Sequence, residues 1–114
     1  MREVVFYRSP SGTVPVEEFL DTLSSKQVEK VLWVIKAVRE LPRVPATYLE
    51  KLKSSDDIWE VRAGFGGDIF RLLGFFHKGN LIVLTNGFQK KSQKTPKNEI
   101  DLAEQRKKEF LSRR

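Results

Sequence analysis

Three strand-like apolar runs occupy the second half of the chain. They cover residues 58–64 (IWEVRAG), 68–76 (DIFRLLGFF) and 80–88 (NLIVLTNGF). The short links FGG and HKG between them contain glycine, which is typical of β-hairpins, so the runs predict consecutive antiparallel strands. A further strand is predicted at residues 3–8 (EVVFYR), because this β-rich segment ends at the turn-forming residues SPSG.

A helical pattern separates the first predicted strand from the other three. Pro15 suits the first turn of a helix, and the acidic residues of the following VEEFLDTL favour the positive end of the helix dipole. Ser24 and Gln27 then match a capping box at the start of a second helix, which ends at LPRVP. Apolar residues recur at helical spacing along this helix: Val28, Val31, Leu32, Ile35 and Val38. The two segments predict a helical hairpin that packs its aliphatic side on a sheet.

A third helical segment follows Pro96, where KNEIDLAEQRKKEFLSRR has helical composition but few apolar residues. The predicted order is therefore β-α-α-β-β-β-α. This is an α+β fold in which an antiparallel sheet is flanked by an N-terminal helical hairpin and a C-terminal helix. A chain of 114 residues is long enough for one hydrophobic core, so a single domain spanning residues 1–114 is expected.

Charge is distributed unevenly along the chain. The net charge is +6, and from Gln89 onward there are nine basic and four acidic residues. This excess favours an anionic partner such as nucleic acid, although an ordinary solvated tail explains it equally well. The absence of cysteine and the presence of a single histidine, His77 in a predicted hairpin link, argue against a transition-metal site and a histidine-based triad. With no membrane-length apolar run and no recognisable signal peptide, a cytoplasmic protein is expected.

Two arginines in the predicted strands need an explanation beyond packing. Alternation places Glu60 and Arg62 on one face of their strand, away from its apolar residues. Arg71 stands in the middle of an otherwise apolar strand, where an unpaired charge is costly. A cross-strand pair between Glu60 and Arg71, contributing at most about 1 kcal/mol, is one explanation. A positive sheet face that receives a phosphate on the two planar guanidinium groups is the other.

Several segments together resemble the RelE/ParE toxin superfamily. They are IWEVR, RLLGFF and LTNGFQKKSQKTPKNEIDLAEQRK, in that order along nearly the whole chain. Within this superfamily the sequence most resembles the phage-type HigB toxins. The segment KKSQKTPKNEI is the most specific part of this resemblance. The resemblance implies the toxin of a type II toxin–antitoxin system, held inactive by a cognate helix-turn-helix antitoxin of the HigA type. It also implies a ribosome-dependent mRNA interferase that needs neither metal nor cofactor.

The resemblance also implies roles for individual residues. Arg62 and Arg71 match the sheet arginines that grip the scissile phosphate. Lys51, in the loop expected before IWEVR, matches a basic position implicated in binding or proton transfer, and Lys91 belongs to the basic pair of the signature. Because clustered lysines depress one another's pKa, one of Lys51, Lys90 or Lys91 is expected to act as the base. The residues expected to bind RNA are Lys53, Lys90, Lys94, Lys97, Gln89 and Phe88.

The chain departs from the family pattern at the end of the last strand. Many relatives have a tyrosine or histidine there as acid or base, but here Asn86 precedes Gly87, and the only tyrosines are Tyr7 and Tyr48. The general acid and base are therefore not identified by the resemblance.

Two other functions remain open. One is a ParE-like toxin that inhibits DNA gyrase by protein binding, against which the basic sheet residues argue. The other is a non-catalytic RNA-binding module in which Phe88 stacks on bases. The remaining phenylalanines of the strands, Phe70, Phe75 and Phe76, are expected to be core residues.

Overall fold

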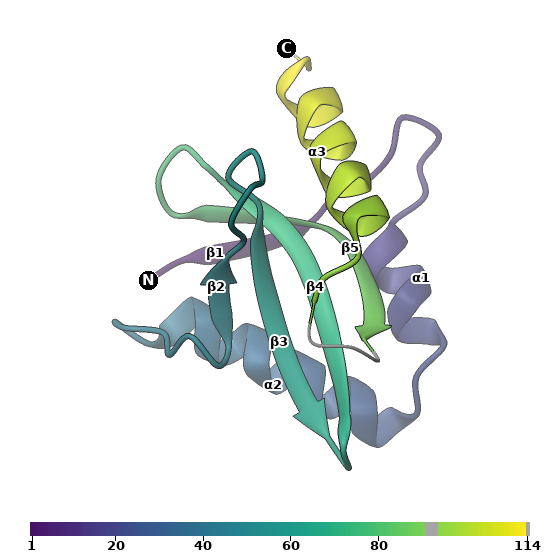
Figure 1. The fold of residues 1–114 in the computed structure, drawn as a ribbon, viewed down its shortest axis with the longest axis vertical. Coiled ribbons are helices and arrows are strands. Elements are labelled where there is room, and N and C mark those ends of the chain that lie inside the picture. The colour runs from purple at the N-terminus through teal and green to yellow at the C-terminus, as the bar shows by residue number, and fades with distance from the viewer. Residues whose placement is uncertain (91–93, 114) are drawn as a thin grey trace.

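The computed structural model describes residues 1–90 and 94–113. Its elements are β1 (Glu3–Phe6), α1 (Pro15–Asp21), α2 (Ser25–Glu40), β2 (Leu49–Lys51), β3 (Trp59–Phe65), β4 (Asp68–His77), β5 (Leu81–Lys90) and α3 (Lys97–Leu111). The α+β class is confirmed, and the predicted order holds apart from the additional strand β2. Helices α1 and α2 pack on one face of the sheet, and α3 lies on the other (Figure 1). Among the described residues, no helix has the length and apolar character needed to cross a membrane.

The sheet is mixed, which corrects the prediction of an antiparallel sheet. Its strand order is β1-β5-β4-β3-β2, and β2 to β5 pair antiparallel as consecutive neighbours. In contrast, β1 pairs with β5 in parallel. Short hairpin links force antiparallel pairing, whereas β1 is joined to the other strands through two helices, so no turn fixes its direction.

Three local predictions about strand limits are also corrected. The strand β2 was not expected, because its three residues are too short to show alternation, and Lys51 lies in this strand rather than in a loop. His77 is the last residue of β4, not part of the following link. The last strand extends to Lys90 because β4 still offers a partner there, with Ile69 opposite Lys90.

The helix starts agree with the sequence. Pro15 is at the first position of α1. At the start of α2, the Ser24 hydroxyl accepts a hydrogen bond from the Gln27 amide at 3.2 Å, and the Ser24 amide donates to the Gln27 side chain at 2.8 Å. The predicted capping box is thus confirmed.

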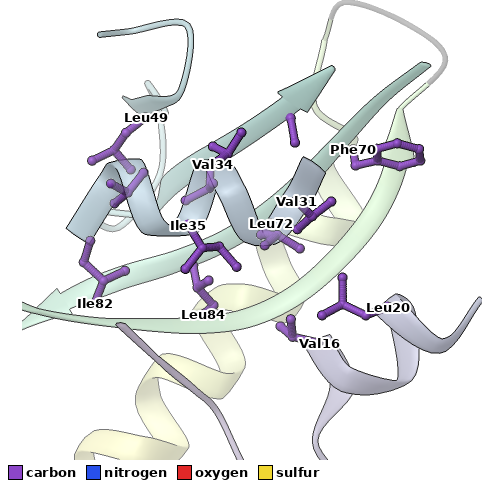
Figure 2. Close-up of a cluster of buried hydrophobic side chains, with 13 residues drawn as sticks. Val16, Leu20, Val31, Val34, Ile35, Leu49, Phe70, Leu72, Ile82 and Leu84 are labelled. Atoms are coloured by element: carbon purple, nitrogen blue, oxygen red, sulfur yellow. The ribbon is translucent and has the colours of Figure 1, made fainter. Parts of the chain in front are cut away.

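The core has two parts, one on each face of the sheet. Figure 2 shows side chains of α1 and α2, among them Val16, Val31 and Ile35, beside Leu72 and Leu84 of the sheet. The second part lies under α3 and contains six buried residues: Tyr7, Ile58, Leu73, Phe75, Val83 and Ala103. Phe70 and Phe75 are buried and Phe76 is half-buried against the first part, which confirms their assignment to the core.

Helix α3 covers only part of its sheet face. It leans over the end of the sheet that is remote from the β3–β4 turn, which projects at the opposite end of the molecule (Figure 1). Ala103 is its only residue that is fully buried within the described part of the chain. The sheet face near the β3–β4 turn is therefore left without a covering helix.

Two glycines of the β3–β4 hairpin provide a matched test of the packing. A methyl group at Gly74, beside the irregularity in the β4–β5 ladder, would overlap the carbonyl oxygen of Val83, whereas at Gly64 it would meet only the Asp68 carbonyl oxygen at 3.8 Å. We expect Gly74→Ala to lower the free energy of unfolding by about 1–3 kcal/mol, because backbone must move. Gly64→Ala should change it by less than about 0.5 kcal/mol. Urea unfolding of both variants measures the difference, and equal effects would contradict the packing described.

Candidate functional site

The two arginines singled out in the sequence face each other across neighbouring strands. Arg62 of β3 is the direct partner of Arg71 of β4, and alternation places both on the sheet face of Leu73, which is the face that carries α3. Glu60 lies two residues before Arg62 on the same face, and its side chain is fully buried. One of its oxygens, Oε1, accepts hydrogen bonds from Arg71 Nη1 at 2.5 Å and from Arg62 Nε at 2.8 Å.

The predicted pair between Glu60 and Arg71 is confirmed, but its setting differs from the expectation. A contribution of at most about 1 kcal/mol applies to cross-strand pairs on an exposed sheet face. Here the side chains of both partners are buried, with Arg71 exposed by only 7%. Removing one member of a buried pair costs far more than an exposed pair contributes, because the remaining charge stays desolvated.

The hydrogen-bonding capacity of the two guanidinium groups is used differently. Arg62 donates through all three nitrogens, to Glu60, to Glu50 at 2.6 Å and to the carbonyl of Ala46 at 3.2 Å. Arg71 Nε, in contrast, is buried and has no hydrogen-bond partner among the residues that the structure describes. Buried donors are nearly always paired in proteins, so an unpaired one in a residue that also lines a pocket indicates a candidate place for an acceptor to bind.

Polar contacts attach the segment before α3 to the same cluster. The hydroxyl of Thr95 donates to the second oxygen of Glu60, Oε2, at 2.6 Å. One turn into α3, the carboxylate of Glu99 accepts from the buried Asn86 amide of β5 at 3.0 Å. Glu60 and Asn86 thereby fix the start of α3 against the sheet next to the arginines.

Electrostatic contacts keep Glu60 ionised. Burial raises the pKa of Glu60, but hydrogen bonds from Thr95, Arg62 and Arg71 outweigh burial, and the resulting pKa lies below the usual range for a glutamate. The pKa of Arg62 is raised, since its bonds to Glu60 and Glu50 exceed the opposing effect of burial. Two carboxylates therefore balance the two guanidinium groups, so this face is less positive than its arginines alone suggest.

A pocket of about 380 Å³ adjoins the two arginines at the edge of β3. The sheet contributes Arg62, Arg71, Gly64 and Ile69 to its lining. The remaining lining residues are Lys30 of α2 and Thr47 and Tyr48, which precede β2. The sequence pattern did not single out these three residues, because they lie in a core-forming helix and in an irregular segment.

Lys51 and Lys53 lie apart from the arginines. Lys51 is the register partner of Trp59, so it belongs to the opposite sheet face from Glu60. Its ammonium group is 2.7 Å from Asp57. With Lys53 and Trp59 it lines a separate depression of about 500 Å³. The structure thus groups Lys51 with Lys53 and not with Arg62 or Arg71.

The other residues predicted to bind RNA do not form one group. Phe88 is opposite Arg71 in the ladder but is half-buried against the second part of the core. Gln89 is exposed and, as the partner of Phe70, belongs to the other sheet face. Lys94 and Lys97 are exposed, and Lys97 pairs with Asp101 at 3.0 Å. Lys91 and the side chain of Lys90 lie outside the residues that the structure describes.

No metal-binding group is found in the described part of the chain, where no three histidine, aspartate or glutamate side chains come together in a suitable cluster. The site consists instead of two guanidinium groups held by carboxylates, an unused buried donor, and a pocket with one aromatic and one ammonium side chain. Such an arrangement can bind an anion that carries a planar group.

Comparison with known proteins gives one family. The model of the family described as "Phage derived protein Gp49-like (DUF891)" matches residues 18–108, a range that includes every residue of the arginine cluster and its pocket. No curated protein matches the chain.

Proposed function

The chain belongs to the Gp49-like family of phage-derived proteins, which is a RelE-like toxin family, and we propose that it is a ribosome-dependent mRNA interferase of the HigB type. The family is associated with the toxins of toxin–antitoxin systems, which supports a toxin role. The endoribonuclease activity and the residues that carry it are the proposal.

The unused donor of Arg71 is the observation that carries this proposal. A buried, unpaired N–H group costs about 1–3 kcal/mol, and a phosphate oxygen is the kind of acceptor that would remove this cost. Arg62 stands directly opposite on β3, so two guanidinium groups converge on one place. Both are fixed by Glu60 and by the sheet, which means that little reorganisation is needed when negative charge develops on a bound phosphate.

The proposed reaction is an attack of a ribose 2′-hydroxyl on the adjacent phosphorus atom. The bond from phosphorus to the 5′-oxygen breaks, one proton leaves the 2′-oxygen, and one proton is delivered to the 5′-oxygen. The products are a 2′,3′-cyclic phosphate and a 5′-hydroxyl group. Arg62 and Arg71 neutralise the charge of the pentacoordinate intermediate.

Proton transfer is assigned to the lysines at the end of β5. The backbone of Lys90 is opposite Ile69, two residues from Arg71 along β4, and Lys91 follows it in the chain. Glu60 does not serve as the base, because it is buried and its pKa is lowered. Lys51 belongs to the other sheet face and pairs with Asp57. Its proposed role is therefore to bind RNA together with Lys53, and not to transfer a proton.

The chemistry of the cleaved ends tests this function. We expect purified ribosomes programmed with a defined mRNA to yield fragments with 5′-hydroxyl and 2′,3′-cyclic phosphate ends, because the nucleophile is the neighbouring 2′-hydroxyl. The matched control is the same mRNA with a single 2′-deoxy nucleotide at the mapped position, which should not be cut. Fragments with 5′-phosphate ends, or cleavage of the deoxy substrate, would contradict the mechanism.

The proposed partners are the ribosome with its mRNA and a cognate helix-turn-helix antitoxin of the HigA type, which together imply action in the cytoplasm. The antitoxin either covers the surface of Arg62, Arg71 and Lys91 or blocks entry into the ribosome. A net charge of +6 suits electrostatic capture by an acidic antitoxin segment. A short neighbouring reading frame for a helix-turn-helix protein would support the toxin assignment.

One observation favours a second candidate, a ParE-like inhibitor of DNA gyrase. Glu50 and Glu60 already balance the charge of Arg62 and Arg71, as expected for arginines that hold a sheet together. A supercoiling assay with purified gyrase separates the two functions. Inhibition of supercoiling by a protein that leaves ribosome-bound mRNA intact would establish this second candidate.

A further inference from the structure

We propose that the pocket at the edge of β3 binds the base of an unpaired RNA nucleotide, with Tyr48 as the surface on which that base stacks. The inference rests on the proposed function and adds to it a base-binding subsite beside the phosphate held by Arg62 and Arg71. Nothing in the family resemblance assigns a role to Tyr48, Lys30 or Trp33.

The pocket exists because the sheet edge is incomplete at this point. The short strand β2 begins at Leu49 and pairs with Trp59 to Val61, so no strand of the described residues continues beside the remainder of β3 on this edge. Gly64 then contributes no side chain, and a methyl group placed there would meet only the Asp68 carbonyl oxygen at 3.8 Å. The resulting space of about 380 Å³ is lined by both arginines and by Tyr48.

Tyr48 is held in place by both its backbone and its ring. Its carbonyl oxygen accepts a hydrogen bond from the Arg62 amide at 2.9 Å, which ties it to the residue beside the proposed phosphate position. Its ring packs edge-on against Trp33, with 5.7 Å between the ring centres and an angle of 82°. A ring fixed in this way loses little entropy when a base stacks on it.

The neighbours of Tyr48 favour a nucleotide over an apolar ligand. Lys30 lines the pocket, and its ammonium group lies 4.8 Å from the centre of the Trp33 ring, so a positive charge stands beside the aromatic pair. Arg62 and Arg71 also line the pocket and add two guanidinium groups. An aromatic surface flanked by basic groups is the arrangement that binds single-stranded nucleic acid, in which bases stack and cations contact the phosphates. The half-exposed Trp33 also extends the aromatic surface beyond the pocket.

Two variants of Tyr48 test the subsite. Tyr48→Leu keeps an apolar side chain at this half-buried position but removes the ring, and Tyr48→Phe keeps the ring and removes only the hydroxyl. The probes are a 2′-O-methyl hexauridylate, which cannot be cleaved, and a hexamer of abasic ribose phosphates with the same charge. Affinities are measured by titration at constant salt, and thermal melting of each variant confirms that it is folded.

Tyr48→Leu should weaken binding of the hexauridylate by about 5- to 150-fold, the equivalent of losing one base–aromatic stack. Its affinity for the abasic hexamer should equal that of the wild type, and Tyr48→Phe should bind both probes as the wild type does. Unchanged binding of the hexauridylate by Tyr48→Leu, equal losses on both probes, or no preference of the wild type for the base-bearing probe would overturn the inference.

The outcomes for the subsite and for the proposed function can be told apart. A wild-type protein that prefers the hexauridylate but does not cut ribosome-bound mRNA would refute the nuclease and leave the subsite standing. A wild-type protein that cuts mRNA at the same rate as Tyr48→Leu, with equal affinity of the two for the hexauridylate, would refute the subsite alone. Inhibition of gyrase that is lost in Tyr48→Leu would identify the pocket as a protein-binding surface and overturn it as an RNA site.

Discussion

Replacing Glu60 by glutamine is expected to lower the free energy of unfolding by about 3–5 kcal/mol, as for removal of one partner from a buried ion pair. Glu60 is fully buried and accepts hydrogen bonds from Arg62, Arg71 and Thr95. Without the negative charge of Glu60, Arg71 becomes a buried cation with no counter-charge described nearby. The hydrogen bond from Thr95 to residue 60 also becomes weaker. Urea unfolding at neutral pH measures the loss.

Glu50→Gln is the matched control for this prediction. Glu50 is the register partner of Glu60 and also pairs with Arg62, but about half of its side chain is exposed. An exposed pair contributes about 0–1 kcal/mol, so the control should be nearly as stable as the wild type. Equal destabilisation by the two variants would mean that overall charge matters here, and not the buried position of Glu60.

The acid side of the stability profile gives a second readout of Glu60. Because its pKa is lower in the folded protein than in the unfolded chain, its stabilisation is fully present above the ordinary glutamate pKa of about 4.3. The stabilisation is lost as the pH falls through the lower pKa of the folded state. The wild type should therefore lose its advantage over Glu60→Gln in acid, and the two stabilities should approach each other.

The features of the fold that were predicted from the sequence are those that depend on local residue patterns. The glycine-containing links define the β3–β4 and β4–β5 hairpins, and the Ser24–Gln27 capping box defines the start of α2. The parallel pairing of β1 with β5 and the short strand β2 are contacts between distant segments, and no local pattern encodes them. Local patterns therefore predicted four of the strands and the antiparallel pairing of β3, β4 and β5, but neither the strand β2 nor the parallel direction of β1.

The same distinction holds for the site. Alternation in β3 and a charge within an apolar strand were enough to pair Glu60 with Arg71. The burial of this pair was not predictable, because it depends on Thr95 returning to the sheet from a later part of the chain. The sheet face of Lys51 was not predictable either, because it depends on the β2–β3 register. The pocket at Tyr48 depends on the residue at which β2 begins. Both require tertiary structure.

Replacing Arg71 by lysine is expected to lower the rate of mRNA cleavage on programmed ribosomes by roughly 10²–10³-fold, as for loss of one donor that stabilises a transition state. Lysine keeps a positive charge next to Glu60, so the buried carboxylate retains a counter-charge. It lacks the planar group and the Nε donor that Arg71 leaves unpaired. Arg71→Ala is the less informative variant, because it also leaves Glu60 without its closest partner and confuses lost activity with lost stability.

Single-turnover cleavage, run in parallel with thermal melting, separates catalysis from folding. Arg62→Ala should also slow cleavage, and the double variant Arg62→Ala/Arg71→Lys should lose less than the product of the two single losses, because both residues act on one phosphate. Lys108→Ala is the control, since Lys108 is an exposed residue in the last turn of α3 and is not among the residues proposed to bind RNA or to act in catalysis. A folded Arg71→Lys protein that cuts at the wild-type rate would show that Arg71 only holds Glu60 in the sheet, and the phosphate site would then have to lie elsewhere.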